Sequence, residues 1–125
     1  MSVQDRASRA RDLRQAISDA IVRVSADFIG RGPTRAKTYL NNHIVFCVMQ
    51  ETLTRGERSL VAEGDGESVR EMRRRFQDAM RPHLCAAIES LTGRQVVSFL
   101  SDNDVESETA IEVFVLDGPI GDTGD

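Results

Sequence analysis

The segment from residue 29 to residue 58 constrains the fold more than any other part of this chain. It opens with the turn Gly30-Arg31-Gly32-Pro33, continues through an extended apolar run, and reaches Thr54 and Glu57. A glycine just past a helix ends that helix, and a proline shortly afterwards cannot continue it. The Thr-x-x-Glu spacing is that of a capping box, in which each side chain accepts a hydrogen bond from the other residue's amide. The segment therefore predicts the order helix, turn, strand, strand, helix.

Three helices are predicted from apolar periodicity and from signals at their ends. Apolar side chains recur every three or four residues from Leu13 to Phe28 and from Val69 to Leu91, which is the pattern of an amphipathic helix. Gly30 and Gly93 mark the ends of these two helices. A short helix between them starts at the capping box and runs to about residue 63.

Four strands are predicted at residues 35–40, 44–49, 96–100 and 110–116, and a polar connection begins at residue 101. The predicted fold class is α+β: a single domain of order α-β-β-α-α-β-β, with a four-stranded, largely antiparallel sheet packed with helices. We assign residues 1–116 to this domain. Residues 117–125, which are rich in glycine and aspartate, are expected to form a disordered acidic tail.

The strand at residues 44–49 is apolar on both of its faces. Val45, Cys47 and Met49 point one way, and the residues between them are apolar as well. A half-exposed antiparallel sheet would alternate apolar with polar side chains. Something must therefore cover each face, either helices on both sides or a second subunit, and we expect a homodimer.

Composition and charge exclude several classes of protein. No apolar run approaches the ~20 residues needed to span a bilayer, and the first residues lack the apolar segment of a signal peptide. We therefore expect a soluble cytoplasmic protein without direct membrane insertion. The formal net charge is −4, and every charged residue after position 100 is acidic. This acidic end argues against nucleic acid as a partner.

The glycine turn is a candidate anion site. Turn amides at Gly30 and Gly32 could point at a phosphate or carboxylate, and Arg31 and Arg35 could neutralise its charge. Proven phosphate loops, however, run from a strand into the amino end of a helix, where the helix dipole favours an anion. This turn runs out of a helix into a strand. We therefore favour a structural chain reversal over a ligand cradle.

A cluster of arginines on the long helix is a candidate partner surface. The side chains of Arg70, Arg74 and Arg81 project away from the apolar stripe of the helix. They could therefore bind an anionic ligand or a protein partner. Three acids, Glu67, Glu71 and Asp78, lie within salt-bridge spacing of them, so a solvated helix face with many ion pairs is the simpler interpretation.

No set of residues in the sequence is specific for catalysis, a metal or a cofactor, so we expect a non-enzymatic protein with none of these. Cys47 and Cys85 form neither a disulfide framework nor a zinc pattern and are expected to be buried. His43 and His83 have no spacing that selects a Cys–His pair. The acids after residue 101 lack the glycine and the final glutamate of a calcium loop.

Five short motifs, in order and at characteristic spacing, resemble one small bacterial domain family. They are Phe28-Ile29-Gly30-Arg31-Gly32-Pro33, Leu53-Thr54-Arg55-Gly56-Glu57, Arg73-Arg74-Arg75-Phe76, the segment from Leu91 to Asp102, and Glu112-Val113-Phe114-Val115-Leu116. The family is MpsC, component C of a sodium-translocating, membrane-potential-generating system. The resemblance covers residues 10 to 116.

The resemblance implies an accessory or regulatory protein that acts through a protein partner, linked to membrane ion or inorganic-carbon transport. It carries no catalytic residues over to this chain. The alternative, which belongs to another class of function, is a small-anion or nucleotide sensor that binds at the turn of residues 30–33.

Overall fold

The computed structural model describes residues 2–121 and confirms the α+β fold and the element order α-β-β-α-α-β-β. The elements are α1 (Val3–Ile29), β1 (Arg35–Asn41), β2 (Ile44–Gln50), α2 (Arg55–Ala62), α3 (Gly66–Thr92), β3 (Val96–Asp104) and β4 (Thr109–Leu116). Helix α1 begins about ten residues earlier than the apolar periodicity predicts. Its polar first turns are exposed and are capped by Ser2, whose Oγ accepts from the Asp5 amide at 3.1 Å.

The four strands form one antiparallel sheet in the order β1-β2-β4-β3. The two hairpins β1–β2 and β3–β4 thus lie side by side, with β2 and β4 in the centre. Strand β3 is longer than predicted, because residues 101–104 continue the ladder with β4 instead of starting a loop. The side chains of residues 101–104 alternate between the two faces of the sheet. Their pairing with β4 therefore makes this polar segment a strand.

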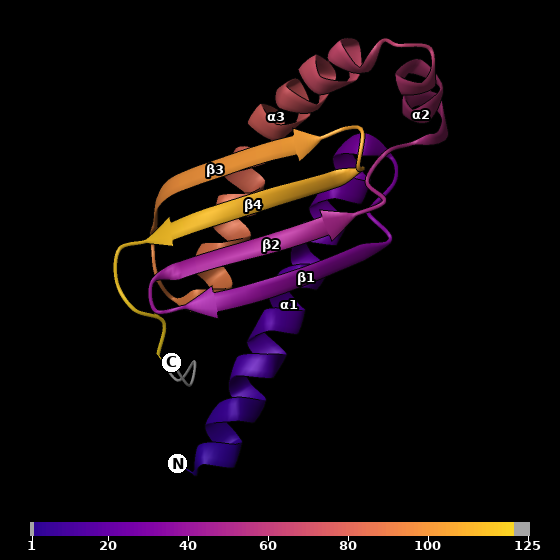
Figure 1. Ribbon diagram of the computed structural model, residues 1–125. Coiled ribbons are helices and arrows are strands. Elements are labelled where there is room, and N and C mark those ends of the chain that lie inside the picture. The colour runs from indigo at the N-terminus through magenta and orange to yellow at the C-terminus, as the bar shows by residue number, and fades with distance from the viewer. Residues whose placement is uncertain (1, 122–125) are drawn as a thin grey trace.

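Helices α1 and α3 both lie on the same side of the sheet, and the hydrophobic core fills the space between (Figure 1). The first half of α1 extends past the edge of the sheet formed by β1. The beginning of α3, together with α2, extends past the opposite edge, at β3 (Figure 1). We call the helix-covered side of the sheet the inner face and the opposite side the outer face. Within residues 2–121 no helix covers the outer face, so helices supply the expected cover on the inner face only.

The predicted helix ends are confirmed by their backbone and cap geometry. Thr54 and Glu57 form the complete capping box, with the Thr54 amide donating to Glu57 Oε1 at 2.8 Å and the Glu57 amide donating to Thr54 Oγ1 at 3.2 Å. Gly30 and Gly93 end α1 and α3 with φ of 87° and 71°. This left-handed backbone suits glycine, which has no Cβ to clash.

Residues 117–121 were expected to be disordered, but the structure places them against the domain. Ile120 is buried in the main core, and its amide donates to the Asn42 carbonyl at 2.9 Å. Arg94 Nε donates to the Pro119 carbonyl at 2.8 Å. The rest of the expected tail, residues 122–125, lies outside the described residues. Over the described range, 2–121, none of the helices combines the length and apolarity that a membrane span requires.

Candidate functional site

The glycine turn at residues 30–33 is held tightly against α1. The Gly30 amide donates to the Ala26 carbonyl at 2.9 Å, which closes the last turn of the helix. A Cβ on Gly32 would lie only 2.9 Å from Val22 Cγ1. Any other residue at this position would therefore crowd Val22 of the helix. Both glycines are therefore explained by chain geometry.

Arg31, one of the two arginines of the candidate anion site, is engaged in contacts within the chain. Arg31 Nη1 donates to the carbonyls of Glu51, at 3.1 Å, and of Leu53, and its Nη2 donates to Thr34 Oγ1 at 3.2 Å. These bonds tie the segment after β2 to the end of α1. Arg35 lies at the start of β1, on the outer face. The contacts of Arg31 give it a structural role at the turn.

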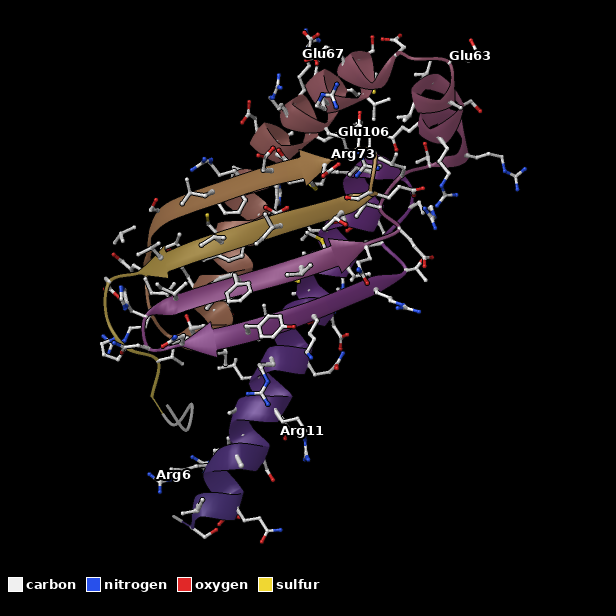
Figure 2. All side chains as sticks on the ribbon, in the orientation of Figure 1. Arg6, Arg11, Glu63, Glu67, Arg73 and Glu106 are labelled. Carbon is white, nitrogen blue, oxygen red and sulfur yellow. The ribbon has the colours of Figure 1, made fainter. Side chains whose placement is uncertain are left out.

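A buried ion pair joins α2 to α3 next to this turn. Arg73 Nη2 lies 2.6 Å from Glu57 Oε1, and Arg73 Nε donates to Glu57 Oε2 at 2.8 Å. Arg73 Nη2 also donates to the Thr52 carbonyl at 2.6 Å. Figure 2 shows Arg73 at the end of the sheet nearest α2. Burial alone would raise the pKa of Glu57, but hydrogen bonds from Arg73 and Thr54 outweigh it, so that pKa lies below its usual value.

The arginines of the candidate partner surface are largely engaged within the chain. Arg70 pairs with Glu67 and with Glu106, both at 3.1 Å, and so ties α3 to the loop between β3 and β4. Arg81 Nη2 donates to the carbonyl of Phe99 at 3.2 Å, and its guanidinium lies over that ring. Arg74 has only a distant contact, 3.9 Å from Glu67. Of the three, Arg74 is the one left most available to a partner.

An exposed apolar groove lies on the first half of α3. Met72 is 53% exposed there. The residues that line the groove are Ser68, Glu71, Met72, Arg75, Phe76 and Ala79. All of these residues belong to the first half of α3.

A row of polar side chains crosses the inner face inside the core. It runs through Thr38, Cys47, Glu112 and Ser101, which are cross-strand neighbours on the four strands. The row begins at α1, where Ser18 Oγ and Thr38 Oγ1 are 2.7 Å apart. Burial raises the pKa of the Cys47 thiol. The core thus contains a polar row in which every strand takes part.

Glu112 is the most unusual member of this row. It is only 2% exposed, and its Oε2 has no hydrogen-bond partner among residues 2–121. Burial raises its pKa to about 7, although the Ser101 hydroxyl acts in the opposite direction. The cavity beside it, which Gln77 and Arg73 also line, has a volume of about 20 Å³, the room needed by one water. A substrate larger than water does not fit there.

Sequence reasoning overlooked Glu112 as an individual residue, although a signal was present. It lies in the apolar run of β4 at the same parity as Ala110, Phe114 and Leu116, which are all buried. A charged residue at an inward position of a strand is rare enough to mark it for attention.

The structure places the residues considered for catalysis on β2, on α3 and in the turn between β1 and β2. Cys47 is fully buried, as expected, while Cys85 is half-buried, and both are free thiols. His83 contacts the ring of Phe28, with 5.1 Å between ring centroids, on the helical side. His43 lies in the turn between β1 and β2.

The outer face is the largest uncovered apolar surface that the sheet presents. Its two central strands contribute only apolar side chains over three successive rows, while its two edge strands contribute mostly polar ones, with Tyr39 and Leu100 as the exceptions. In the order β1, β2, β4, β3, the four rows are Asn41, Ile44, Val115 and Ser98; Tyr39, Phe46, Val113 and Leu100; Lys37, Val48, Ile111 and Asp102; Arg35, Gln50, Thr109 and Asp104.

Two features of the outer face stand out. The rings of Tyr39 and Phe46 stack with centroids 4.7 Å apart, and Leu100 in the same row is 59% exposed. At one end of the face, β1 carries two cations and β3 carries two anions. Sequence reasoning missed this pattern because it depends on which strands pair.

Comparison with known proteins identifies the family. Residues 9–118 match the family model described as "Na+-translocating membrane potential-generating system (MpsC)". No curated protein and no solved structure matches the chain. Because the match covers most of the chain, this protein belongs to the MpsC family.

Proposed function

We propose that this member of the MpsC family is a non-enzymatic accessory protein that acts by binding proteins: a second copy of itself and a partner from a membrane transport system. The observation that carries the proposal is the outer face of the sheet, which has an apolar centre and no helix over it. A contiguous apolar patch on the surface of a folded domain is typical of a protein-binding surface.

The state of the reactive side chains supports a binding role over catalysis. The Cys47 thiol is buried and has a raised pKa, so its nucleophilic thiolate is disfavoured. The Glu112 carboxyl faces a cavity that fits one water. Neither group is open to a small-molecule substrate in this conformation.

The family description supports the choice of partner, because it names a membrane system. We propose that the partner is a protein of a system for membrane ion or inorganic-carbon transport, and that it contacts the extended first half of α3. The exposed Met72 and Arg75, which line the same groove, provide an apolar contact and a positive charge on one helix. Such mixed surfaces are common at interfaces between proteins.

The test is co-purification from detergent-solubilised membranes of the host with tagged protein. Wild type and Leu91→Glu, a control at the other end of α3, should capture the same membrane transport protein. Met72→Glu should lose it. Enrichment of no membrane transport protein, or equal capture by all three proteins, would contradict the proposal.

The alternative is a small-anion or nucleotide sensor at the turn of residues 30–33. The carbonyl and hydroxyl contacts of Arg31 weigh against it, because they use the guanidinium that an anion would need. A thermal-shift screen with nucleotides, phosphate and bicarbonate tests it. A ligand at a hundred times its Kd stabilises a protein by about 2.7 kcal/mol. A shift that disappears in Arg35→Ala would favour the sensor.

A further inference from the structure

We propose that two copies of the chain pair through their outer faces, about a two-fold axis parallel to the strands, so that β1 of one copy lies over β3 of the other. The proposal rests on the proposed homodimer and adds its surface and its geometry. Three properties of the outer face lead to it: the apolar centre, the separated charges at the edges, and the position of these charges along the strands.

The charges cannot be neutralised by each other within one copy. Lys37 and Asp102 belong to the same row but to opposite edge strands. Three strand spacings separate them, about 14 Å, which exceeds the reach of an ion pair. Within one copy, Lys37 instead lies over the Tyr39 ring, with its Nζ 5.2 Å from the centroid.

Pairing about an axis parallel to the strands brings these charges together. The rotation exchanges the two edges of the sheet and keeps each row at its own level. Lys37 then faces Asp102 of the second copy, and Arg35 faces Asp104. Each contact occurs twice because the interface is symmetric. The four charged positions that find no counterpart across their own sheet thus find one across the interface.

A second two-fold axis is possible between the two faces, but it does not bring the opposite charges together. An axis perpendicular to the strands places β1 over β1 and β3 over β3. The charged end of each face then lies over the uncharged end of the other, where the edge residues are Asn41 and Ser98. The charge pattern therefore selects one of the two face-to-face arrangements.

The size of the face and its apolar centre fit the same arrangement. Strands of about seven residues, at about 3.3 Å per residue and 4.8 Å between strands, give a face of roughly 20 by 23 Å. Two such faces cover on the order of 900 Å² before side-chain relief is counted, which approaches the ~1,200 Å² of small specific interfaces. In the paired form β2 lies over β4, so Phe46 meets apolar side chains such as Val113 of the second copy.

A second copy fits this surface better than a membrane or an unrelated chain. A lipid surface attracts a face of one charge sign, whereas this face carries both signs at one end. The pattern is complementary to itself under the rotation, which is the requirement for an isologous interface.

Charge reversal with purified protein tests the geometry. Variant one carries Asp102→Lys and Asp104→Lys, and variant two carries Arg35→Glu and Lys37→Glu. The mass should be measured by analytical ultracentrifugation over a range of concentrations at low salt. We expect wild type to be a dimer and each variant alone to dimerise at least tenfold more weakly, because like charges then face each other.

Mixing the two variants gives the decisive result. In a mixed pair every reversed charge again faces its opposite, so a heterodimer should form with an affinity near that of wild type. Its recovery also demonstrates that both variants are folded. A control with Asp27→Lys and Asp78→Lys, which changes the net charge as much as variant one but on exposed helical positions, should remain a dimer.

Several results would overturn the proposal. These are a monomeric wild type at all concentrations, dimers that persist in both reversed variants, and a mixture that stays monomeric. The outcome is independent of the membrane partner, because the assay contains this chain alone. A monomer that still captures the transport protein would refute the pairing and leave the partner role standing, and a dimer that captures nothing would do the reverse.

Discussion

The two faces of the sheet differ in a way that the character of their residues does not explain. The inner face, under α1 and α3, encloses the carboxyl group of Glu112 and a row of polar side chains. The outer face, which no helix within residues 2–121 covers, presents the apolar side chains of β2 and β4 to the surroundings. The position of the helices, more than hydrophobicity, thus decides what this sheet buries. The exposed apolar centre of the outer face and the buried carboxyl group of the inner face are both unfavourable for the stability of the fold, so each calls for another explanation.

The largest expected effect comes from substitutions of two neighbouring residues of β4, one on each face of the sheet. Phe114, on the inner face, is fully buried, so Phe114→Ala should lower the free energy of unfolding by about 3–5 kcal/mol. Val113, on the outer face, has no helix against it, and Val113→Ala should cost less than about 1 kcal/mol. Urea denaturation measures both.

The measurement should use the lowest practical protein concentration, because self-association adds stability at higher ones. If Val113→Ala costs as much as Phe114→Ala under these conditions, the two faces are equally buried and the distinction between them is wrong.

A second prediction concerns pH and the carboxyl group on the inner face. The pKa of Glu112 is raised to about 7 from the ordinary value of 4.5, so the folded state holds this proton more tightly than the unfolded state. The associated stability is fully present below pH 4.5 and is lost as pH rises through 7. The loss amounts to about 3 kcal/mol.

Denaturation midpoints measured from pH 4.5 to pH 8.5 test this prediction. In Glu112→Gln the decline between these pH values should be smaller by about 3 kcal/mol, because glutamine does not titrate. Asp102→Asn, a matched change of an acid on the outer face, should keep the decline of wild type. A decline of equal size in wild type and Glu112→Gln would show that Glu112 is not its source.

The smallest expected effect lies outside both faces, at the start of α2. Thr54→Ala removes one half of the capping box and should cost about 1 kcal/mol in thermal or urea denaturation. Ser59→Ala, an exposed position within the same helix, should stay within about 0.5 kcal/mol of wild type. An unchanged midpoint in Thr54→Ala would mean that α2 does not depend on this cap.

The sequence predicted the elements well, because most of their signals are local. The capping box and the glycine helix ends each involve residues a few positions apart, and all of them are confirmed. The tail and the end of β3 were less predictable. Ile120 looks isolated among glycines and aspartates, and only its neighbours in space make it a core residue. Likewise, residues 101–104 resemble a loop until β4 pairs with them.

The candidate site was predicted less completely, because it depends on contacts between residues that are distant in the chain. The arginines singled out in the sequence are mostly engaged in contacts that hold the chain together: Arg31 with carbonyls after β2, and Arg70 with a loop acid 36 residues away. The residues that distinguish the molecule, Glu112 and the edge charges, have meaning only in the assembled sheet. Lys37 and Asp102 are far apart in the chain and share a row solely through two intervening strands.

The sequence by itself determined the order of the helices and strands, their ends, and the fact that β2 is apolar on both sides. These features follow from backbone preferences and side-chain periodicity within a few residues. Only the tertiary structure decided that β2 pairs with β4 and that both long helices pack on the same face. These choices depend on contacts between residues distant in the chain. They determine which apolar surface stays uncovered, and they place opposite charges on its two edges.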